Sequence, residues 1–279
     1  MTIEIQIRAC HTLAEYDECV ELQHLVWGED IVVPSAIFVV AHHTGGLTLG
    51  AFIDAEKTDD GERMVGFSLA LAGIRGSAGS DGQRPCSGER FLHSHMTAVL
   101  PEYQNAGVGR RLKLRQREEA LERGIQLIEW TFDPLELKNA HFNFVRLGAI
   151  ARRFIPNCYG ITESPLHAGL PTDRLIAEWW LDSPRVCGIL GGKALPDNLA
   201  AQSASSPVCI SLPADIVELK SKDPAAGARI QSEVRAQFQG YFERGYVATS
   251  IENSGTSTDY ILEQRDSVAG LRLPKSPAE

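Results

Sequence analysis

The chain has 279 residues, of which 43% are hydrophobic, and it carries a formal net charge of −9 with a sequence pI near 5.4. This composition supports one large or two small globular domains. The acidic balance argues against a general nucleic-acid binder, because such proteins concentrate positive charge. No run of residues approaches the apolar length of a membrane span, so we expect no membrane partner.

Cysteine and histidine usage predicts neither disulfides nor a metal site. The six cysteines are scattered, none forms a C-x-x-C pair, and no histidine cluster completes a zinc pattern. The first 18 residues contain no apolar targeting segment. We therefore expect a cytoplasmic protein with reduced thiols.

Local patterns in the first 100 residues predict alternating strands and helices. Isoleucines alternate with polar residues over 3–7, as in a half-buried strand. Thr12 and Glu15 form a capping box that opens a helix to about Trp27. The remaining predicted elements are a helix over 34–42, an antiparallel hairpin of strands 47–53 and 64–74, a long loop over 75–90 and a strand over 91–100.

A glycine-rich turn, Gln104 to Gly109, lies between that strand and a predicted helix over 107–123. The first N–H groups of a helix have no intrahelical partners and lie at the positive end of its dipole, which suits a phosphate. Residues 110–117 add five basic side chains and no acidic one. The alternative is a solvated helix face, with Glu118, Glu119 and Glu122 as ion-pair partners.

The rest of the chain predicts further strands and helices on either side of a linker. The residues of 183–207 are mostly small or polar, as in linkers. Asp223 and Pro224 predict a helix start, followed by apolar residues at i+4 steps through Phe242. The other predictions are strands over 126–132, 152–159, 174–181 and 208–212, a helix over 139–147, a hairpin of 246–251 with 259–262, and a disordered tail over 264–279.

The turn does not have the spacing of a P-loop or of a Rossmann dinucleotide motif. The string from Thr97 to Gly109 instead resembles the central motif of the GNAT superfamily of N-acyltransferases, V-x-P-x-[YF]-[QR]-x-x-G-[IV]-G. The resemblance implies an α/β (α+β) fold, with a mixed central sheet flanked by helices, over an acyl-CoA-binding domain of residues 1–182. Residues 208–263 would then form a smaller, partial GNAT-like β-α-β-β unit.

The same resemblance implies acetyl-CoA, or another acyl-CoA, as the co-substrate and no metal. In this family the turn binds the pyrophosphate, the backbone of the preceding strand meets the pantetheine arm, and the helix after the fifth strand often touches CoA. The implied cofactor-binding residues are Ala98, Val99, Leu100, Gln104, Asn105, Ala106, Gly107, Val108, Gly109, Arg110, Asn139 and Phe142.

Direct attack by an amine requires a general base, because a lysine-like amine is mostly protonated at neutral pH. His93, His95 and Thr97 alternate along one face of the predicted fourth strand, and His95 is the preferred base, with Glu129 as a second candidate. The tyrosine that commonly protonates the leaving thiolate in this family is replaced by Phe144. Tyr159 is the candidate substitute, although both histidines and Tyr159 also fit purely structural roles.

Two functions therefore follow from the sequence. The first is an N-acyltransferase that moves an acetyl or other acyl group from CoA to an amine of a small molecule or peptide. The second is a non-catalytic acyl-CoA sensor or scaffold on the same fold, which the phenylalanine at position 144 favours. The acceptor, the acyl length, the role of residues 208–263 and homodimer formation are left open.

Overall fold

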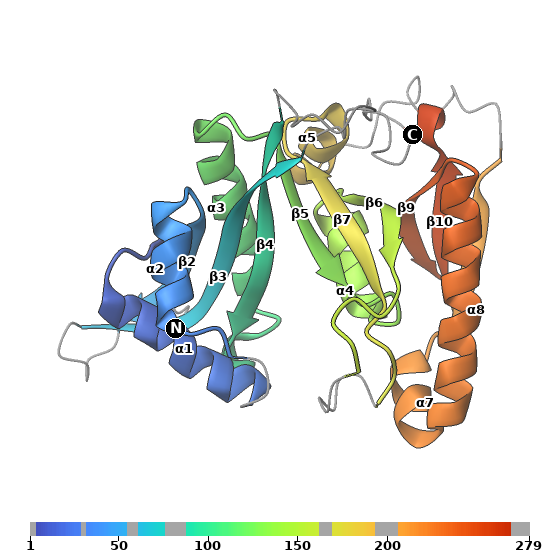
Figure 1. The fold of residues 1–279 in the computed structure, drawn as a ribbon, viewed down its shortest axis with the longest axis horizontal. Coiled ribbons are helices and arrows are strands. Elements are labelled where there is room, and N and C mark those ends of the chain that lie inside the picture. The colour runs from blue at the N-terminus through green and yellow to red at the C-terminus, as the bar shows by residue number, and fades with distance from the viewer. Residues whose placement is uncertain are drawn as a thin grey trace, which may run out of the picture. The chain divides into compact units, whose positions relative to one another are not determined.

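The computed structural model describes residues 4–28, 32–54, 61–75, 88–161, 169–192 and 206–268 (Figure 1). The chain forms two compact units, a first unit of residues 1–128 and a second unit of residues 129–279. Each unit contains both strands and helices.

The first unit contains an antiparallel arrangement of four strands in the order β1-β2-β3-β4. Their bounds are Ile5–Ala9 (β1), Leu47–Asp54 (β2), Glu62–Arg75 (β3) and Glu89–Val99 (β4). The predicted hairpin of β2 and β3 is confirmed by their antiparallel pairing, in which Leu47 lies opposite Ala70. Most of the predicted loop over 75–90, residues 76–87, lies outside the described residues.

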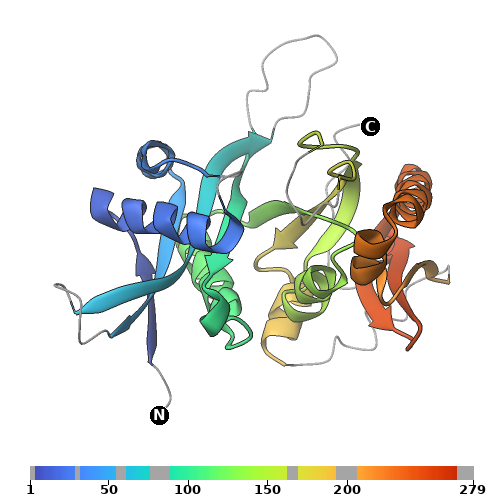
Figure 2. The ribbon, with the colours of Figure 1, turned by 90° about the horizontal axis from the view of Figure 1, so that it is seen from below.

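Three helices, α1 (Leu13–Trp27), α2 (Ser35–His43) and α3 (Val108–Glu122), pack on these strands (Figure 2). The predicted capping box is present, because Thr12 accepts the N–H of Glu15 and the Glu15 carboxylate accepts the N–H of Thr12. Arg8 reinforces this helix start through an ion pair with Glu15. Local sequence therefore sets where α1 begins.

The helices cover opposite faces of the sheet. Phe67 of β3 contacts Trp27 of α1 and Phe38 of α2. Ser94 of β4 lies opposite Ala70, which is three residues from Phe67 and so points to the other face, and Ser94 accepts a 2.7 Å hydrogen bond from Lys113 of α3. Thus α1 and α2 cover one face, and α3 covers the other.

The other six strands of the described residues follow in the order β5-β7-β6-β9-β10-β8, and all but the first two residues of β5 belong to the second unit. The strand bounds are Leu127–Phe132 (β5), Ile150–Ile155 (β6), Arg174–Trp180 (β7), Val208–Pro213 (β8), Tyr246–Asn253 (β9) and Ser257–Gln264 (β10). The helices are α4 (Leu137–His141), the π-helix η2 (Phe142–Arg146), α5 (Pro184–Leu190), α7 (Ile216–Lys222) and α8 (Pro224–Glu243).

The predicted strand after residue 207, the helix from Pro224 and the hairpin are all present. Asp223 caps α8 by accepting the N–H of Ala226. These elements continue the sheet of the second unit, because Ala248 of β9 pairs with Ala151 of β6. The assignment of residues 208–263 to a separate partial GNAT-like domain stays a prediction.

An aromatic cluster forms part of the core of the second unit. Phe238 of α8 is fully buried and contacts Phe154, Phe242 and Tyr260. Tyr260 is also fully buried, and its hydroxyl donates a 2.6 Å hydrogen bond to the carbonyl of Pro134. Burial raises the pKa of this phenol well above its ordinary value.

Several element bounds differ from the sequence prediction. The predicted helix over 139–147 is split into α4 and the π-helix η2. Strand β6 ends at Ile155 because the proline that follows has no N–H to donate to the ladder and Asn157 adopts a positive φ of 46°. Tyr159 thus lies in a turn rather than in a strand.

The linker and the tail predicted from the sequence both contain ordered structure. Ser183 accepts the N–H of Val186 and caps α5 inside the predicted linker, whose residues 193–205 lie outside the described residues. The start of the predicted tail forms a short 3-10 helix, Arg265–Ser267, and Val268 is buried against Ile150 and Val247. Residues 269–279 lie outside the described residues.

Lys113 is a buried amine whose pKa desolvation lowers from 10.5 to about 7. Between these two values the unfolded chain binds a proton that the folded chain does not, so the folded state gains stability as the pH rises above 7. We expect a gain of about 1.4 kcal/mol per pH unit from this residue. Urea unfolding at pH 6 to 9 should show a flatter profile for Lys113→Met.

Lys138 is exposed, so Lys138→Met is the control and should keep the wild-type pH profile. Equal pH slopes in wild type and Lys113→Met would contradict the assignment.

Phe238→Ala should lower the free energy of unfolding by about 3–5 kcal/mol, because it leaves a cavity in the aromatic cluster. Phe242 lies one turn later on α8 and is only half-buried, so Phe242→Ala should cost clearly less. Denaturant unfolding of both variants measures the difference. If the two substitutions are equally costly, the cluster is not centred on Phe238.

Candidate functional site

The glycine-rich turn follows β4 directly. A short 3-10 helix, η1 (Pro101–Tyr103), is closed by hydrogen bonds from Tyr103 N–H to the Leu100 carbonyl and from Gln104 N–H to the Pro101 carbonyl. The Gln104 side chain also donates to the Val99 carbonyl at 2.9 Å. Asn105 and Gly107 adopt left-handed conformations, with φ values of 60° and 82°. These contacts fix the path of the backbone from β4 into α3.

The first turn of α3 presents unpaired backbone N–H groups. Gly107 is the N-cap and provides no side-chain cap, and the first intrahelical bond runs from Arg111 N–H to the Gly107 carbonyl at 3.0 Å. Among the described residues, the N–H groups of Val108, Gly109 and Arg110 have no hydrogen-bond acceptor. Since these groups lie at the positive end of the helix, they form a potential anion site.

The space beside these amides is open within the described residues. A Cβ atom added to Gly107 or Gly109 would meet no other atom within 4 Å. Asn105, Ala106 and Gly107 are all exposed. The backbone can therefore approach an anion closely, as the sequence predicted for a glycine-rich turn.

Most of the basic residues after the turn have partners within the chain. Arg111 donates to the Ile5 carbonyl, and Lys113 is buried against Ser94. Arg115 pairs with Glu118 and with Glu119. Arg110 is half-buried beside the amides, and no ion-pair partner for it occurs among the described residues. The positive charge available to an anion is thus concentrated at Arg110 and the turn.

A β-bulge in β4 changes the predicted histidine face. Leu69 lies opposite Met96 and Ala70 lies opposite Ser94, so His95 is the extra residue. His93 lies opposite Leu71 and Thr97 lies opposite Ser68, three residues away on β3, so His93 and Thr97 point to opposite faces. The prediction that they share one face was wrong, because strand alternation fails at a bulge.

His95 keeps the properties of a proton acceptor. Its side chain is exposed, and its ring centroid lies 6.3 Å from that of His93. Partial desolvation nevertheless lowers the imidazole pKa below its usual value. A histidine with a lowered pKa is neutral at physiological pH, the state in which it accepts a proton. The following residues, Ala98 and Leu100, are buried, and Val99 is half-buried.

Glu129, the second candidate base, is held in a buried ion-pair network of the second unit. Its carboxylate lies 2.5 Å from Nη2 of Arg153, and Nε of Arg153 also reaches Glu178 at 3.0 Å. Nε of Arg152 lies 3.2 Å from the same Glu178. These two arginines are neighbours in the chain, and both reach Glu178 because β6 has a bulge between Ala151 and Phe154. Because a guanidinium already engages the Glu129 carboxylate, His95 is the better candidate.

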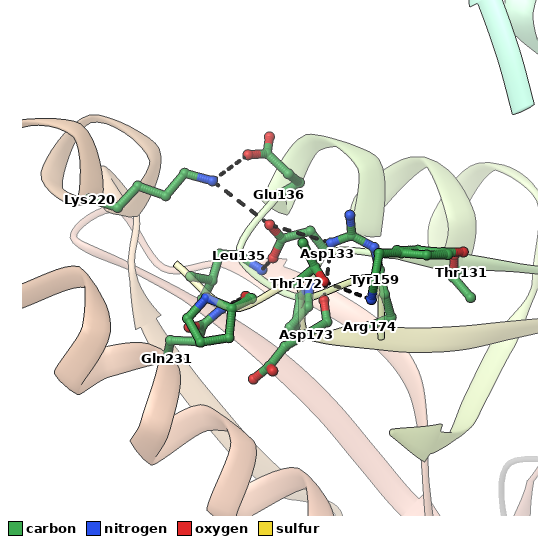
Figure 3. A network of polar contacts seen from close by, with 12 residues as sticks. Thr131, Asp133, Leu135, Glu136, Tyr159, Thr172, Asp173, Arg174, Lys220 and Gln231 are labelled. Carbon is green, nitrogen blue, oxygen red and sulfur yellow. Dashed lines mark hydrogen bonds and ion pairs between the residues drawn. The ribbon is translucent and has the colours of Figure 1, made fainter. Parts of the chain in front are cut away.

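Tyr159 lies in the turn after β6, with its side chain 51% exposed (Figure 3). Its hydroxyl lies 2.9 Å from the hydroxyl of Thr131, and the Arg174 guanidinium lies 5.6 Å from the ring centroid. A phenol at an exposed position, fixed by a neighbouring hydroxyl, can donate a proton to a leaving group. Its surroundings are compatible with the predicted acid role.

The other predicted residues of the second unit lie on α4 and η2. Asn139 is exposed on α4, and Phe142, the first residue of the π-helix, is half-buried. Phe144 is buried and packs edge-to-face against Phe132 and Tyr260, so it is a core residue. Phe142 thus begins a π-helical turn, a conformation that occurs frequently at functional sites.

The sequence did not indicate the residues that hold Tyr159 in place. Asp173 is buried and forms two hydrogen bonds with Arg235, which lies 62 residues later. A lone aspartate before a strand and an arginine in a long helix carry no local signal of such a pair. Only the fold brings them together.

The described residues contain no group of three or more His, Cys, Asp or Glu side chains that could hold a metal ion. None of their helices combines the length and apolar character needed to cross a bilayer.

Comparison with known proteins identifies the fold. No protein-family model and no curated protein matches the sequence. Among solved structures, Arabidopsis thaliana NAA60 in complex with acetyl-CoA matches with a TM-score of 0.51 at 12% identity, over 64% of this chain and 99% of that one. The same protein in complex with a bisubstrate analogue matches with a TM-score of 0.50 at 12% identity, over 64% of this chain and 100% of that one.

The element order and these matches confirm the fold that the string from Thr97 to Gly109 predicted. The chain has the GNAT fold, a mixed α/β architecture of a central sheet flanked by helices.

Proposed function

We propose that this protein is an N-acyltransferase that moves an acetyl or other acyl group from CoA to an amine. The observation that carries the proposal is the set of N–H groups of Val108, Gly109 and Arg110 at the start of α3, which have no acceptor among the described residues and lie beside two glycines with open Cβ positions. Such a turn suits the pyrophosphate of CoA. The GNAT fold supports the proposal, since a structural neighbour with that fold is a complex with acetyl-CoA.

The proposed reaction is a direct displacement at the thioester. The acceptor nitrogen attacks the carbonyl carbon, the C–N bond forms and the C–S bond breaks. His95 takes the proton that the amine loses, and Tyr159 donates a proton to the departing thiolate. Ala98 to Leu100 would contact the pantetheine arm, and Asn139 and Phe142 would contact CoA, as the family resemblance implies.

The acceptor in this proposal is an amine of a small molecule or a peptide. The bisubstrate analogue bound to NAA60 supports a two-substrate reaction on this fold. We further propose that residues 1–182 form the acyl-CoA-binding domain. Residues 208–263 would add structure that a minimal acyltransferase lacks.

A non-catalytic acyl-CoA sensor is the second candidate, and the burial of Phe144 favours it. That position cannot supply a proton, so a sensor would bind acyl-CoA without turnover. Thiol release measured over a panel of amines separates the two functions. Release with any amine above the rate in water supports the transferase, whereas tight binding with no release supports the sensor.

Gly109→Leu should abolish acetyl-CoA binding, with at least a tenfold loss of affinity by calorimetry. Gly109 does not have a positive φ and a Cβ there meets no atom, so the leucine fits the chain but occupies the place of the anion. Gly240→Leu is the control and should bind like wild type, because a Cβ at this helical glycine of α8 would make only an ordinary contact of 3.8 Å with Arg244. A wild-type protein that does not bind CoA thioesters would rule out both candidate functions.

His95→Gln should lower thiol release about hundredfold, because it removes the general base. In wild type, activity should fall at acidic pH through a pKa below the ordinary histidine value of 6.5, since protonated imidazole cannot accept a proton. The variant should lose this acidic limb. His93→Gln is the control, and an unchanged acidic limb in His95→Gln would exclude His95 as the base.

A further inference from the structure

We propose that Arg235 of α8 is a positioning residue for Tyr159, acting through Asp173 and Thr172. This inference rests on the proposed function, in which Tyr159 protonates the leaving thiolate. It also gives the C-terminal elements a role, because α8 then fixes the turn that carries the acid.

Asp173 anchors the turn to α8. It is 1% exposed, and its two carboxylate oxygens accept hydrogen bonds from Nε and Nη2 of Arg235, each at 2.8 Å. The oxygen Oδ1 also accepts the N–H of Asn157 at 2.9 Å. A bidentate guanidinium–carboxylate pair fixes direction as well as distance, so the position of α8 sets that of residue 157.

Thr172 transmits this position to Tyr159. Its hydroxyl accepts the Tyr159 N–H at 2.8 Å and donates to the Gly160 carbonyl at 2.7 Å. The Thr172 carbonyl accepts the N–H of Cys158 at 2.9 Å, and the Thr172 N–H donates to the Asn157 side chain at 3.3 Å. The turn from Asn157 to Gly160 is thus hydrogen-bonded along its length to Thr172 and Asp173.

A second contact from the same face of α8 restrains the same segment. Gln231 lies one helical turn before Arg235 and donates a 2.8 Å hydrogen bond to the Pro171 carbonyl. Gln231 is 4% exposed, and Phe238, on the next turn of α8, is fully buried in the core. Helix α8 therefore binds Pro171 and Asp173, and Thr172 and Asp173 bind the turn. Figure 3 shows Thr172 beside Tyr159.

The Tyr159 side chain is restrained from the other side by the end of β5. Its hydroxyl meets Thr131, and its ring lies beside Arg174, whose guanidinium reaches Asp133 at 3.8 Å. Lys220 of α7 lies 3.9 Å from Asp133 and 2.7 Å from Glu136. Thus α7 contacts the residues beside the Tyr159 ring, and α8 contacts the residues that bind its turn.

The test uses the full chain and compares Arg235→Met with Arg229→Met. Arg229 is exposed on α8, and no partner for it occurs among the described residues, so it is a matched control. With the most reactive amine of the panel, we expect Arg235→Met to lower the turnover number at least tenfold and to leave the acetyl-CoA Kd within twofold. Arg229→Met should change neither. Arg235→Lys keeps the positive charge but loses the bidentate guanidinium geometry. Its turnover number should therefore lie between those of Arg235→Met and Arg229→Met.

A Tyr159→Phe background distinguishes positioning from general stability. If Arg235 acts through the Tyr159 hydroxyl, Arg235→Met should change the turnover number less than twofold once that hydroxyl is gone. A loss in this background as large as in wild type would overturn the inference.

Fluorine NMR of 3-fluorotyrosine at position 159 tests the positioning without any turnover. The Tyr159 resonance should shift or broaden in Arg235→Met and remain unchanged in Arg229→Met. An unchanged resonance in Arg235→Met would overturn the inference. A wild type that releases no thiol would refute the acyltransferase function, and this signal would still decide whether Arg235 positions Tyr159.

Discussion

The backbone N–H groups that open α3 are the constraint on which the functional interpretation depends. Three consecutive amides lack acceptors among the described residues, and no side chain caps them. Leaving such groups unpaired is unfavourable unless water or a ligand satisfies them. The fixed path from Leu100 to Gly107 shows that this arrangement is built by local hydrogen bonds. An anion that accepts from all three amides would complete the helix start.

Most of the charged residues in the rest of the candidate site form ion pairs with each other. Arg115 and Arg123 both pair with Glu119, and Arg153 bridges Glu129 and Glu178. Partners that are already satisfied add little to the binding of an external ligand. The amides of the turn and the Arg110 side chain are therefore the groups best able to bind an anion. Five formal charges over residues 110–117 overstate how strongly the run can bind one.

Features encoded by neighbouring residues could be predicted from the sequence, and features made by distant residues could not. The capping box of Thr12 with Glu15 and the glycine-rich turn have fixed local spacings, so the sequence predicted them correctly. The bulge at His95 depends on the register of β3, and the pair of Asp173 with Arg235 spans 62 residues. Neither leaves a periodic signal, which is why the histidine face was wrong and the support of Tyr159 was missed.

The burial of Phe144 and the proposed positioning of Tyr159 both involve the C-terminal elements. The Phe144 ring is buried between Phe132 and Tyr260, and Tyr260 belongs to β10. A hydroxyl on residue 144 would have to be buried beside two aromatic rings, which is costly without a partner. Tyr260 of β10 contacts both Phe144 and Phe238. Phe238 belongs to α8, the helix that positions the turn of Tyr159. The elements that bury Phe144 thus also position Tyr159, the acid of the proposed reaction.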